Sequence, residues 1–472
     1  MKKLLLYGLI IATASIGCRK IEVDGATTIV NGPTDSTGTE NVILQGRISA
    51  NRTLHAQYTY KLRGLVYVTN GAILTIEPGT KIVGEAGTAD KGALIITRSC
   101  KIIADGTVDK PIVFTSEAPT PQRGDWAGLV ILGNAPTNAS FNGTQGIGEI
   151  EGGVNNSDGL GLYGTPASQG QNPADNSGIL RYVRIEYAGF AFLPDKEING
   201  LTFGGVGSGT IVDNVQVSYA NDDSFEWFGG TVNCTHLISY RTLDDDFDTD
   251  NGFSGKVQFG IALRDSSVAD ISKSESFESD NDANGSALLP QTAAVFSNMT
   301  IAGPKATLST VGNNLFVWGA QIRRNSSISI FNSIIMGYPN GLYIDATKGI
   351  PTDNNIPATL FVQNTIIAGC PQPVLYSLGT NTNVPITPNT TATITDWFNT
   401  PAFGNSTLTN NTDVGLTDAF NYANPDFNPT TSSVAVNGAS FTHPKLATGF
   451  TSVAYQGACA AGDTWWKTWT KF

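Results

Sequence analysis

The chain has 472 residues and a formal net charge of −12, and only 14% of its residues are charged, whereas glycine alone accounts for 52. Such a low charge content excludes long charged helices and coiled coils. The acidic balance argues against nucleic acid as a partner. With three histidines in the chain, His55, His236 and His443, zinc sites and histidine-based triads are poorly supported.

The N-terminus has the form of an export signal. Two lysines precede an apolar run over residues 4–16, which is too short to span a bilayer as a mature helix. The run ends at Gly17 and Cys18 and resembles a bacterial lipoprotein signal, which implies that residues 1–17 are removed and Cys18 is acylated. We expect a lipid bilayer as a partner through Cys18 and a polar, flexible tether over residues 18–40.

This resemblance predicts an exported outer-membrane lipoprotein, on the cell surface or on the periplasmic face. An ordinary secretory signal followed by a chance cysteine is the alternative.

Short β-prone runs separated by Gly, Asn and Asp recur after the tether. The alternating pattern of residues 183–188 returns 32 residues later at 215–220, and again at spacings of 21 at 236–240 and 257–261. Repeats of this length are typical of a solenoid whose coils each bury an apolar side against the next coil. We therefore predict an all-β fold, a right-handed parallel β-helix over residues 41–370, in preference to a β-sandwich.

A second repeat, Asn-x-x-Ile-x-Gly, begins at Asn298, Asn332 and Asn364. In stacked coils these asparagines occupy one column, and we expect them to be structural residues that hydrogen-bond to one another from coil to coil.

Two stretches depart from the repeats. Residues 134–178 are rich in Gly, Asn and Ser, and we expect a long side loop that lies over one face. Residues 371–472 are expected to be an irregular region that ends in an aromatic cap, because a solenoid must cover its last coil. A sugar-stacking platform is the alternative interpretation of the aromatic residues 465–472.

Four further cysteines are widely spaced and form no metal-binding pair. Cys100 and Cys234 lie in apolar strand-like runs and are expected to be buried thiols. A disulfide between Cys370 and Cys459 is possible on the sequence alone.

Three acidic turns form the best candidate site. Phe225, Phe247 and Phe277 are each followed by an acid, and stacking would make them one inward aromatic column. The neighbouring column then holds carboxylates from successive coils, which repel one another unless a cation or a proton compensates. We predict a structural Ca²⁺ site there, with plain turn capping as the alternative. The predicted ligands are Glu226, Asp248, Asp250, Glu278, Asp280 and Asp282.

Several motifs carry a family resemblance. The runs 124–133, 151–153, 175–178, 197–205 and 219–230 resemble rungs of lipid-anchored or secreted right-handed parallel β-helix proteins of Bacteroidota-type cell envelopes. The resemblance implies the fold and an envelope location. It supplies no catalytic residues.

These observations favour a non-catalytic ligand-binding or adhesion module with cation-stabilised acidic turns. The main alternative is a polysaccharide lyase or glycoside hydrolase acting on acidic glycans, and a third is an accessory subunit of an outer-membrane assembly. Polysaccharide or an envelope protein is thus a possible partner. If the chain is an enzyme, the candidate catalytic residues are Asp222, Asp223, Asp244, Asp245, Lys256 and Arg264.

Overall fold

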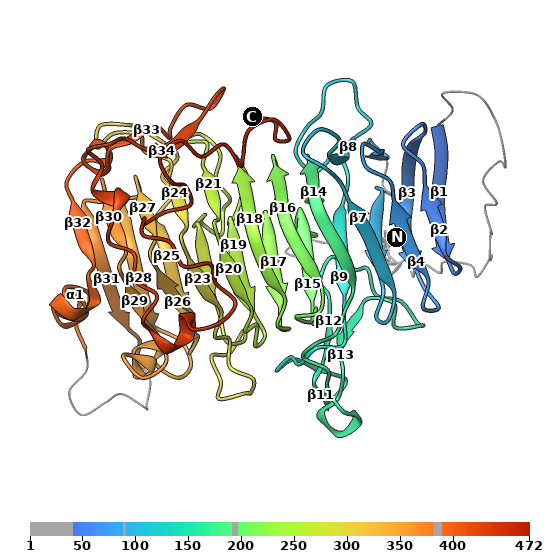
Figure 1. Ribbon diagram of the computed structural model, residues 1–472. Coiled ribbons are helices and arrows are strands. Elements are labelled where there is room, and N and C mark those ends of the chain that lie inside the picture. Colours follow the sequence, from blue (N-terminus) through green and yellow to red (C-terminus); the bar gives the residue numbers. More distant parts are fainter. Residues whose placement is uncertain (1–40, 88–90, 191–196, 381–388) are drawn as a thin grey trace, which may run out of the picture.

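The computed structural model describes residues 41–87, 91–190, 197–380 and 389–472 (Figure 1). The predicted signal, Cys18 and the tether lie outside the described residues. The chain winds as a right-handed parallel β-helix, so the predicted all-β fold is confirmed. Within the described part of the chain, none of the helices has the length and apolar character that crossing a membrane requires.

The coils contribute strands to three faces, each a parallel ladder. The first face consists of β6 (Ala93–Ile96), β9 (Gly128–Leu132), β15 (Leu201–Gly204), β17 (Phe225–Phe228), β19 (Phe247–Asp250), β22 (Phe277–Ser279), β25 (Trp318–Arg323), β28 (Asn340–Ala346) and β31 (Gln372–Leu378). The second contains β2 (Arg52–Leu54), β4 (Ile73–Ile76), β7 (Lys101–Asp105), β20 (Lys256–Gln258), β23 (Val295–Ser297), β26 (Ser329–Phe331) and β29 (Val362–Gln363).

The third face contains β5 (Lys81–Gly84), β8 (Ile112–Ser116), β21 (Ile261–Leu263), β24 (Thr300–Ala302), β27 (Ile334–Met336), β30 (Ile366–Ala368) and β32 (Ser406–Leu408). Long strands bend from one face to the next and join the faces into one sheet of 28 strands. They are β1 (Asn41–Ile48), β3 (Thr59–Val68), β14 (Gly178–Glu186), β16 (Ile211–Ser218) and β18 (Asn233–Tyr240).

Inward side chains fill the solenoid from end to end with Leu, Ile, Val and Phe. Phe225, Phe247 and Phe277 superpose in strand register, with ring centroids 5.7 and 5.6 Å apart. Complete burial of each such side chain contributes about 1.5–3 kcal/mol, so the inward columns hold the coils in one register.

A column of left-handed residues marks the bend between the second and third faces. Its members have φ between 48° and 61°, a region in which Asn is the least strained side-chain-bearing residue. The predicted column of asparagines therefore exists, and in strand register it consists of Tyr182, Asn214, His236, Phe259, Asn298, Asn332 and Asn364.

The expected bonds between these asparagines are replaced by bonds to the C-terminal segment. Asn298 Nδ2 donates to the Tyr455 carbonyl at 2.9 Å, and Asn332 Nδ2 donates to the Ser440 carbonyl at 3.2 Å. The prediction failed because the polar groups at an exposed bend can form their hydrogen bonds with any chain segment that covers the bend.

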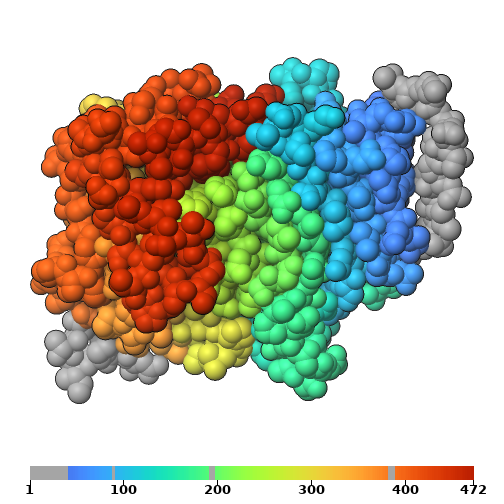
Figure 2. Space-filling view, viewed as in Figure 1, coloured from blue at the N-terminus to red at the C-terminus, as the bar shows by residue number. Residues whose placement is uncertain are grey.

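We call residues 409–472 the strap. They include β33 (Leu416–Asp418) and β34 (Asp426–Pro429) and run back along the side of the solenoid (Figure 1). Apolar strap residues cover outward side chains of the third face such as Ile238, Leu263 and Met336. The strap, red in Figure 2, crosses the left part of this view and leaves the blue coils and much of the green coils uncovered.

The predicted aromatic cap is therefore wrong in its position. Trp466 and Trp469 are 1% and 0% exposed in the lateral packing of the strap, which also argues against a sugar-stacking platform built from them. The ladder continues beyond residue 370, since β31 pairs with β28 and β32 pairs with β30. The last coil is covered by α1 (Thr391–Phe398), which buries Ile394 and Phe398 in the core.

The side loop over residues 134–178 has structure of its own. It contains two short antiparallel pairs, β10 (Ser140–Phe141) with β11 (Thr144–Gln145), and β12 (Ile147–Glu149) with β13 (Leu162–Gly164). Ile150 and Tyr163 are buried against first-face side chains such as Phe228. The loop thus lies against the first face, as Figure 1 shows below β9 and β15.

The four cysteines of the described residues are all buried and free. The suggested Cys370–Cys459 disulfide is therefore wrong. Cys370 lies in the solenoid core and Cys459 belongs to the strap, in two different apolar clusters, and burial raises the pKa of both thiols.

Candidate functional site

The outward side of β17, β19 and β22 carries a row of acids beside the phenylalanine column. Strand register pairs Glu226 with Asp248 and Asp248 with Glu278, and continues to Gln321 on β25. Alternation along each strand turns the phenylalanine inward and the next residue outward. Stacking of equivalent coils therefore brings together carboxylates 22 and 30 residues apart.

A second row of acids lies two positions before the phenylalanines, in the turns that enter these strands. Asp223 Oδ1 accepts from the Asp245 backbone N–H at 2.7 Å, and Asp245 Oδ1 accepts from the Glu275 N–H at 2.5 Å. The sequence interpretation included Asp223 and Asp245 but missed Glu275. The fixed offset of two residues before each phenylalanine is the signal that could have found it.

Carboxylate oxygens of the two rows and of Asp222 and Asp244 approach within 4.8 Å in three groups, two of which share Asp223. We call the eight carboxylates of these groups the acidic face. They are Asp222, Asp223, Glu226, Asp244, Asp245, Asp248, Glu275 and Glu278.

The eight carboxylates of the acidic face cannot all be ionised at once without a compensating positive charge. At an effective dielectric constant of ~20, two unit charges 4.8 Å apart repel by about 3 kcal/mol. Burial, and after it the charge of neighbouring carboxylates, raises the pKa of most members. Those with a strongly raised pKa are Asp222, Asp223, Glu226, Asp244, Asp248 and Glu275.

Apart from Glu278 Oε1, which is ion-paired with Arg323, three buried oxygens of the acidic face accept no hydrogen bond from the described residues. They are Asp244 Oδ1, Asp248 Oδ1 and Glu275 Oε1, and Glu275 is only 2% exposed. A buried oxygen without a donor is costly. Each of these oxygens therefore needs either a bound proton or a cation close to it.

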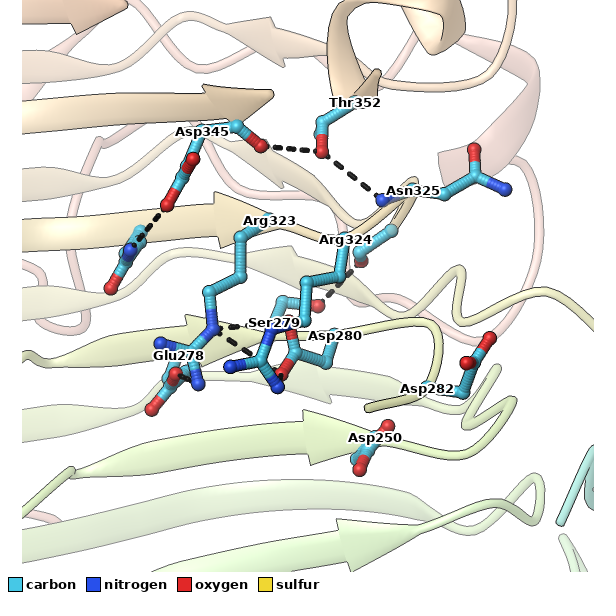
Figure 3. A network of polar contacts seen from close by, with 12 residues as sticks. Asp250, Glu278, Ser279, Asp280, Asp282, Arg323, Arg324, Asn325, Asp345 and Thr352 are labelled. Carbon is cyan, nitrogen blue, oxygen red and sulfur yellow. Dashed lines mark hydrogen bonds and ion pairs between the residues drawn. The ribbon is translucent and has the colours of Figure 1, made fainter. Parts of the chain in front are cut away.

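Arginines that the sequence interpretation missed compensate part of the predicted calcium set. Arg323 Nε lies 3.1 Å from Asp280 Oδ1, and Arg324 Nη1 lies 2.8 Å from Asp280 Oδ2. Arg323 also forms an ion pair with Glu278 (Figure 3). The contribution of both arginines follows from the pairing of β25 with β22, which no sequence repeat indicated.

The predicted ligands therefore do not form one site. Asp282 lies apart in Figure 3 and caps its own turn, accepting from the backbone N–H of Ser286 at 2.9 Å. Asp250 follows Asp248 along β19, and burial raises its pKa to about 6. Glu226 and Asp248 remain together with Asp223.

The two basic residues proposed for catalysis are placed where neither serves as a base. Arg264 is completely buried, 3.1 Å from Asp246 Oδ1, with Phe316 against its guanidinium. Lys256 is bonded by Nζ to Thr448 of the strap, away from the acidic face. Their proximity in sequence to the acidic turns was misleading, because a coil returns to its face only after passing the other two.

Two groups beside the acidic face were not foreseen. Trp318 lies opposite Glu275 on the next coil, in register with the second row of acids. It is partly exposed and stacks on Tyr343 with ring centroids 4.7 Å apart. Glu151 of the side loop lies against Glu226, and burial raises its pKa to about 7. A flat aromatic surface and a carboxyl that holds its proton are thus next to the carboxylate groups.

Comparison with known proteins gives one clear result. Residues 46–470, nearly the whole chain, match the family model described as a pectate-lyase-like β-helix domain. No curated protein matches the chain. The match agrees with the solenoid described above and leaves the chemistry to the residues themselves.

Proposed function

We propose that this chain, which belongs to the pectate-lyase-like β-helix domain family, is a lipid-anchored envelope protein that binds Ca²⁺ and a saccharide on its acidic face. The proposal rests on one observation, which is that buried oxygens of Asp244, Asp248 and Glu275 accept no hydrogen bond from the described residues. Ca²⁺ accepts six to eight oxygen ligands in flexible geometry, so these donors fit it. Asp223, Glu226 and Asp248, whose carboxylate oxygens lie within 4.8 Å of one another, would hold the ion, which would supply a positive centre for an anionic or hydroxyl ligand.

A saccharide is supported by the neighbouring Trp318. Its partly exposed ring is stiffened by the stack on Tyr343 and by Lys273, whose Nζ lies 4.6 Å from the Trp318 centroid. Rigid aromatic surfaces with a polar surround are typical of ligand sites.

Binding is favoured over lyase chemistry because the nearby arginines are paired with carboxylates and Lys273 lies over the Trp318 ring. A lyase needs a free base to abstract a proton. Arg264 is paired with Asp246, and Arg323 and Arg324 are paired with carboxylates.

The test is calcium titration by isothermal calorimetry on protein first freed of metal with EGTA. We expect one binding event and a rise in Tm on addition of Ca²⁺. Replacing Asp248→Asn together with Glu275→Gln should abolish both, whereas Asp109→Asn, an exposed acid in a distant turn, should change neither. A calorimetric trace without heat, with an unchanged Tm, would reject the cation.

Anchoring is tested separately by metabolic labelling with palmitate. The label should be incorporated into the full-length protein and be lost in Cys18→Ala. Labelling that is unchanged in this variant would reject acylation at Cys18.

A glycoside hydrolase is the second candidate, and the raised pKa of Glu151 favours it. A general acid must hold its proton near neutral pH, as Glu151 does beside Glu226. Release of reducing ends from a polysaccharide panel, lost in Glu151→Gln with calcium binding preserved, would establish this activity. Inactivity of the calcium-loaded protein over the panel would leave the binding function.

A further inference from the structure

We infer a second ligand site, a cationic groove on the third face, which binds a saccharide that carries sulfate or carboxylate groups. The groove is a half-open cavity of about 340 Å³, within the range of small-molecule sites. It lies where the strap ends, on the part of the face left uncovered. Its lining includes Lys81, Thr115, Arg184, Glu186, Tyr187 and Lys471.

Strand register builds the floor of the groove from three successive coils. Lys81 of β5 pairs with Val113 of β8, and Val113 pairs with Arg184 of β14, so these three side chains form one outward row. Thr115 and Glu186 form the next outward row, and Thr115 Oγ1 donates to Glu186 Oε2 at 3.0 Å. The row that the strap covers elsewhere with apolar side chains is polar here.

Lys471 is brought to the groove by the end of the strap. Its backbone N–H donates to Gln216 Oε1 at 2.9 Å, and its carbonyl accepts from Gln216 Nε2 at 2.8 Å. The Trp469 carbonyl accepts from Arg184 Nη1 at 3.2 Å. The last residues are thus fixed to β14 and β16, and the exposed Lys471 stands at the cavity.

The charge of the groove is opposite to that of the protein. Three cationic side chains, Lys81, Arg184 and Lys471, face one carboxylate, Glu186, so the lining carries an excess of two positive charges, whereas the whole chain carries −12. Glu186 accepts from Arg184 Nε at 3.1 Å and holds that guanidinium in place. Such an arrangement attracts and orients an anion.

Tyr187 supplies a flat surface at the groove. Its ring stacks on Tyr219 with centroids 5.0 Å apart and planes 3° from parallel. Arg123 and Arg241 each lie 5.4 Å from the Tyr219 centroid. A fixed, partly exposed ring packs against the C–H face of a sugar. The cations of the groove, Lys81, Arg184 and Lys471, then select a sugar that carries negative charge.

This site is independent of the acidic face, since it uses another face and needs no metal. The test is calorimetric titration of the full-length protein in EDTA with chondroitin 4-sulfate disaccharide, and with lactose as the neutral disaccharide. We expect the sulfated disaccharide to bind, to bind at least tenfold more weakly at high salt, and lactose to give no heat.

Three variants locate the binding. Lys81→Glu with Lys471→Glu should weaken it at least tenfold, and Lys348→Glu, an exposed lysine near the far end, should leave it unchanged. Tyr187→Asn, which tolerates the positive φ of 62° at this position, should also weaken it. Circular dichroism and Tm confirm that each variant is folded.

Several outcomes would overturn the inference. They are no binding in EDTA, equal binding of lactose, or binding unaffected by the Lys81 and Lys471 changes. Complete competition by inorganic sulfate at the same concentration would reject the saccharide and leave a simple anion site. Stronger capture by vesicles of anionic phospholipid than by the disaccharide would assign the groove to lipid headgroups instead.

Discussion

The first and third faces carry equally regular rows of outward side chains, yet they are completed in different ways. On the third face two outward rows are apolar, one with Ile238 and the other with Leu263 and Met336, and the strap covers both. On the first face the row contains Glu226 and Asp248, and Asp248 Oδ1 accepts no hydrogen bond from the described residues. Apolar rows gain free energy when chain covers them, whereas a row of carboxylates loses it unless a counter-charge arrives.

The largest expected effect compares the packing of the core below the acidic face with the packing of the strap on the third face. Phe247→Ala removes an inward ring below the acidic face, and Trp466→Ala removes a buried ring of the strap. Each should lower the free energy of unfolding by about 3–5 kcal/mol because a cavity replaces a large side chain. Urea midpoints measure both, with Trp465→Ala, a partly exposed neighbour, as the milder control. A strap variant as stable as the parent would mean that the strap is only loosely attached.

Removing the buried positive charge of Arg264, which compensates Asp246, should have the next largest effect. Arg264→Met leaves Asp246 buried without its cation and should cost about 3 kcal/mol. Adding Asp246→Asn should restore part of that loss, because the uncompensated charge is then gone. Equal thermal stability of the single and double variants would contradict the assignment.

Two carboxyl groups next to the acidic face, those of Glu151 and Asp250, should make stability depend on pH. The pKa of Glu151 is raised from 4.5 to about 7 and that of Asp250 from 3.8 to about 6. The folded protein then binds protons that the unfolded chain releases, so stability falls by about 2 kcal/mol as pH rises from ~4.5 to ~7 in EGTA.

Two controls sharpen the pH prediction. Ca²⁺ at pH 7 should restore the lost Tm if it replaces the protons, and Glu151→Gln should flatten the dependence. A Tm that rises with pH over this range in EGTA would contradict the raised pKa values.

The smallest effect is expected at the surface of the strap. Lys467 Nζ lies 3.7 Å from Asp426, and both side chains are substantially exposed. Lys467→Ala should change the free energy of unfolding by less than about 0.5 kcal/mol, since exposed ion pairs are weak. A loss above 1 kcal/mol in urea unfolding would show that the strap depends on this pair.

The sequence predicted the solenoid because its signal is local and repeated. Equal spacing sufficed to place Phe225, Phe247 and Phe277 in one column, and the same spacing pointed to the acids that follow them. It did not reveal Arg323, Arg324 or Glu151, which reach the acidic face from other coils and from the side loop. Their spacing follows no repeat.

The amino-acid sequence by itself determined the coil, since alternation and period fix which side chains point inward and which coils stack. Only the tertiary structure decided what covers each face. The strap crosses the bends at Asn298 and Asn332 and carries Lys471 to the far end of the third face. Contacts of the strap join residues up to 285 positions apart. A non-repeating segment settles where complementary surface is available, and this depends on the finished shape of the solenoid.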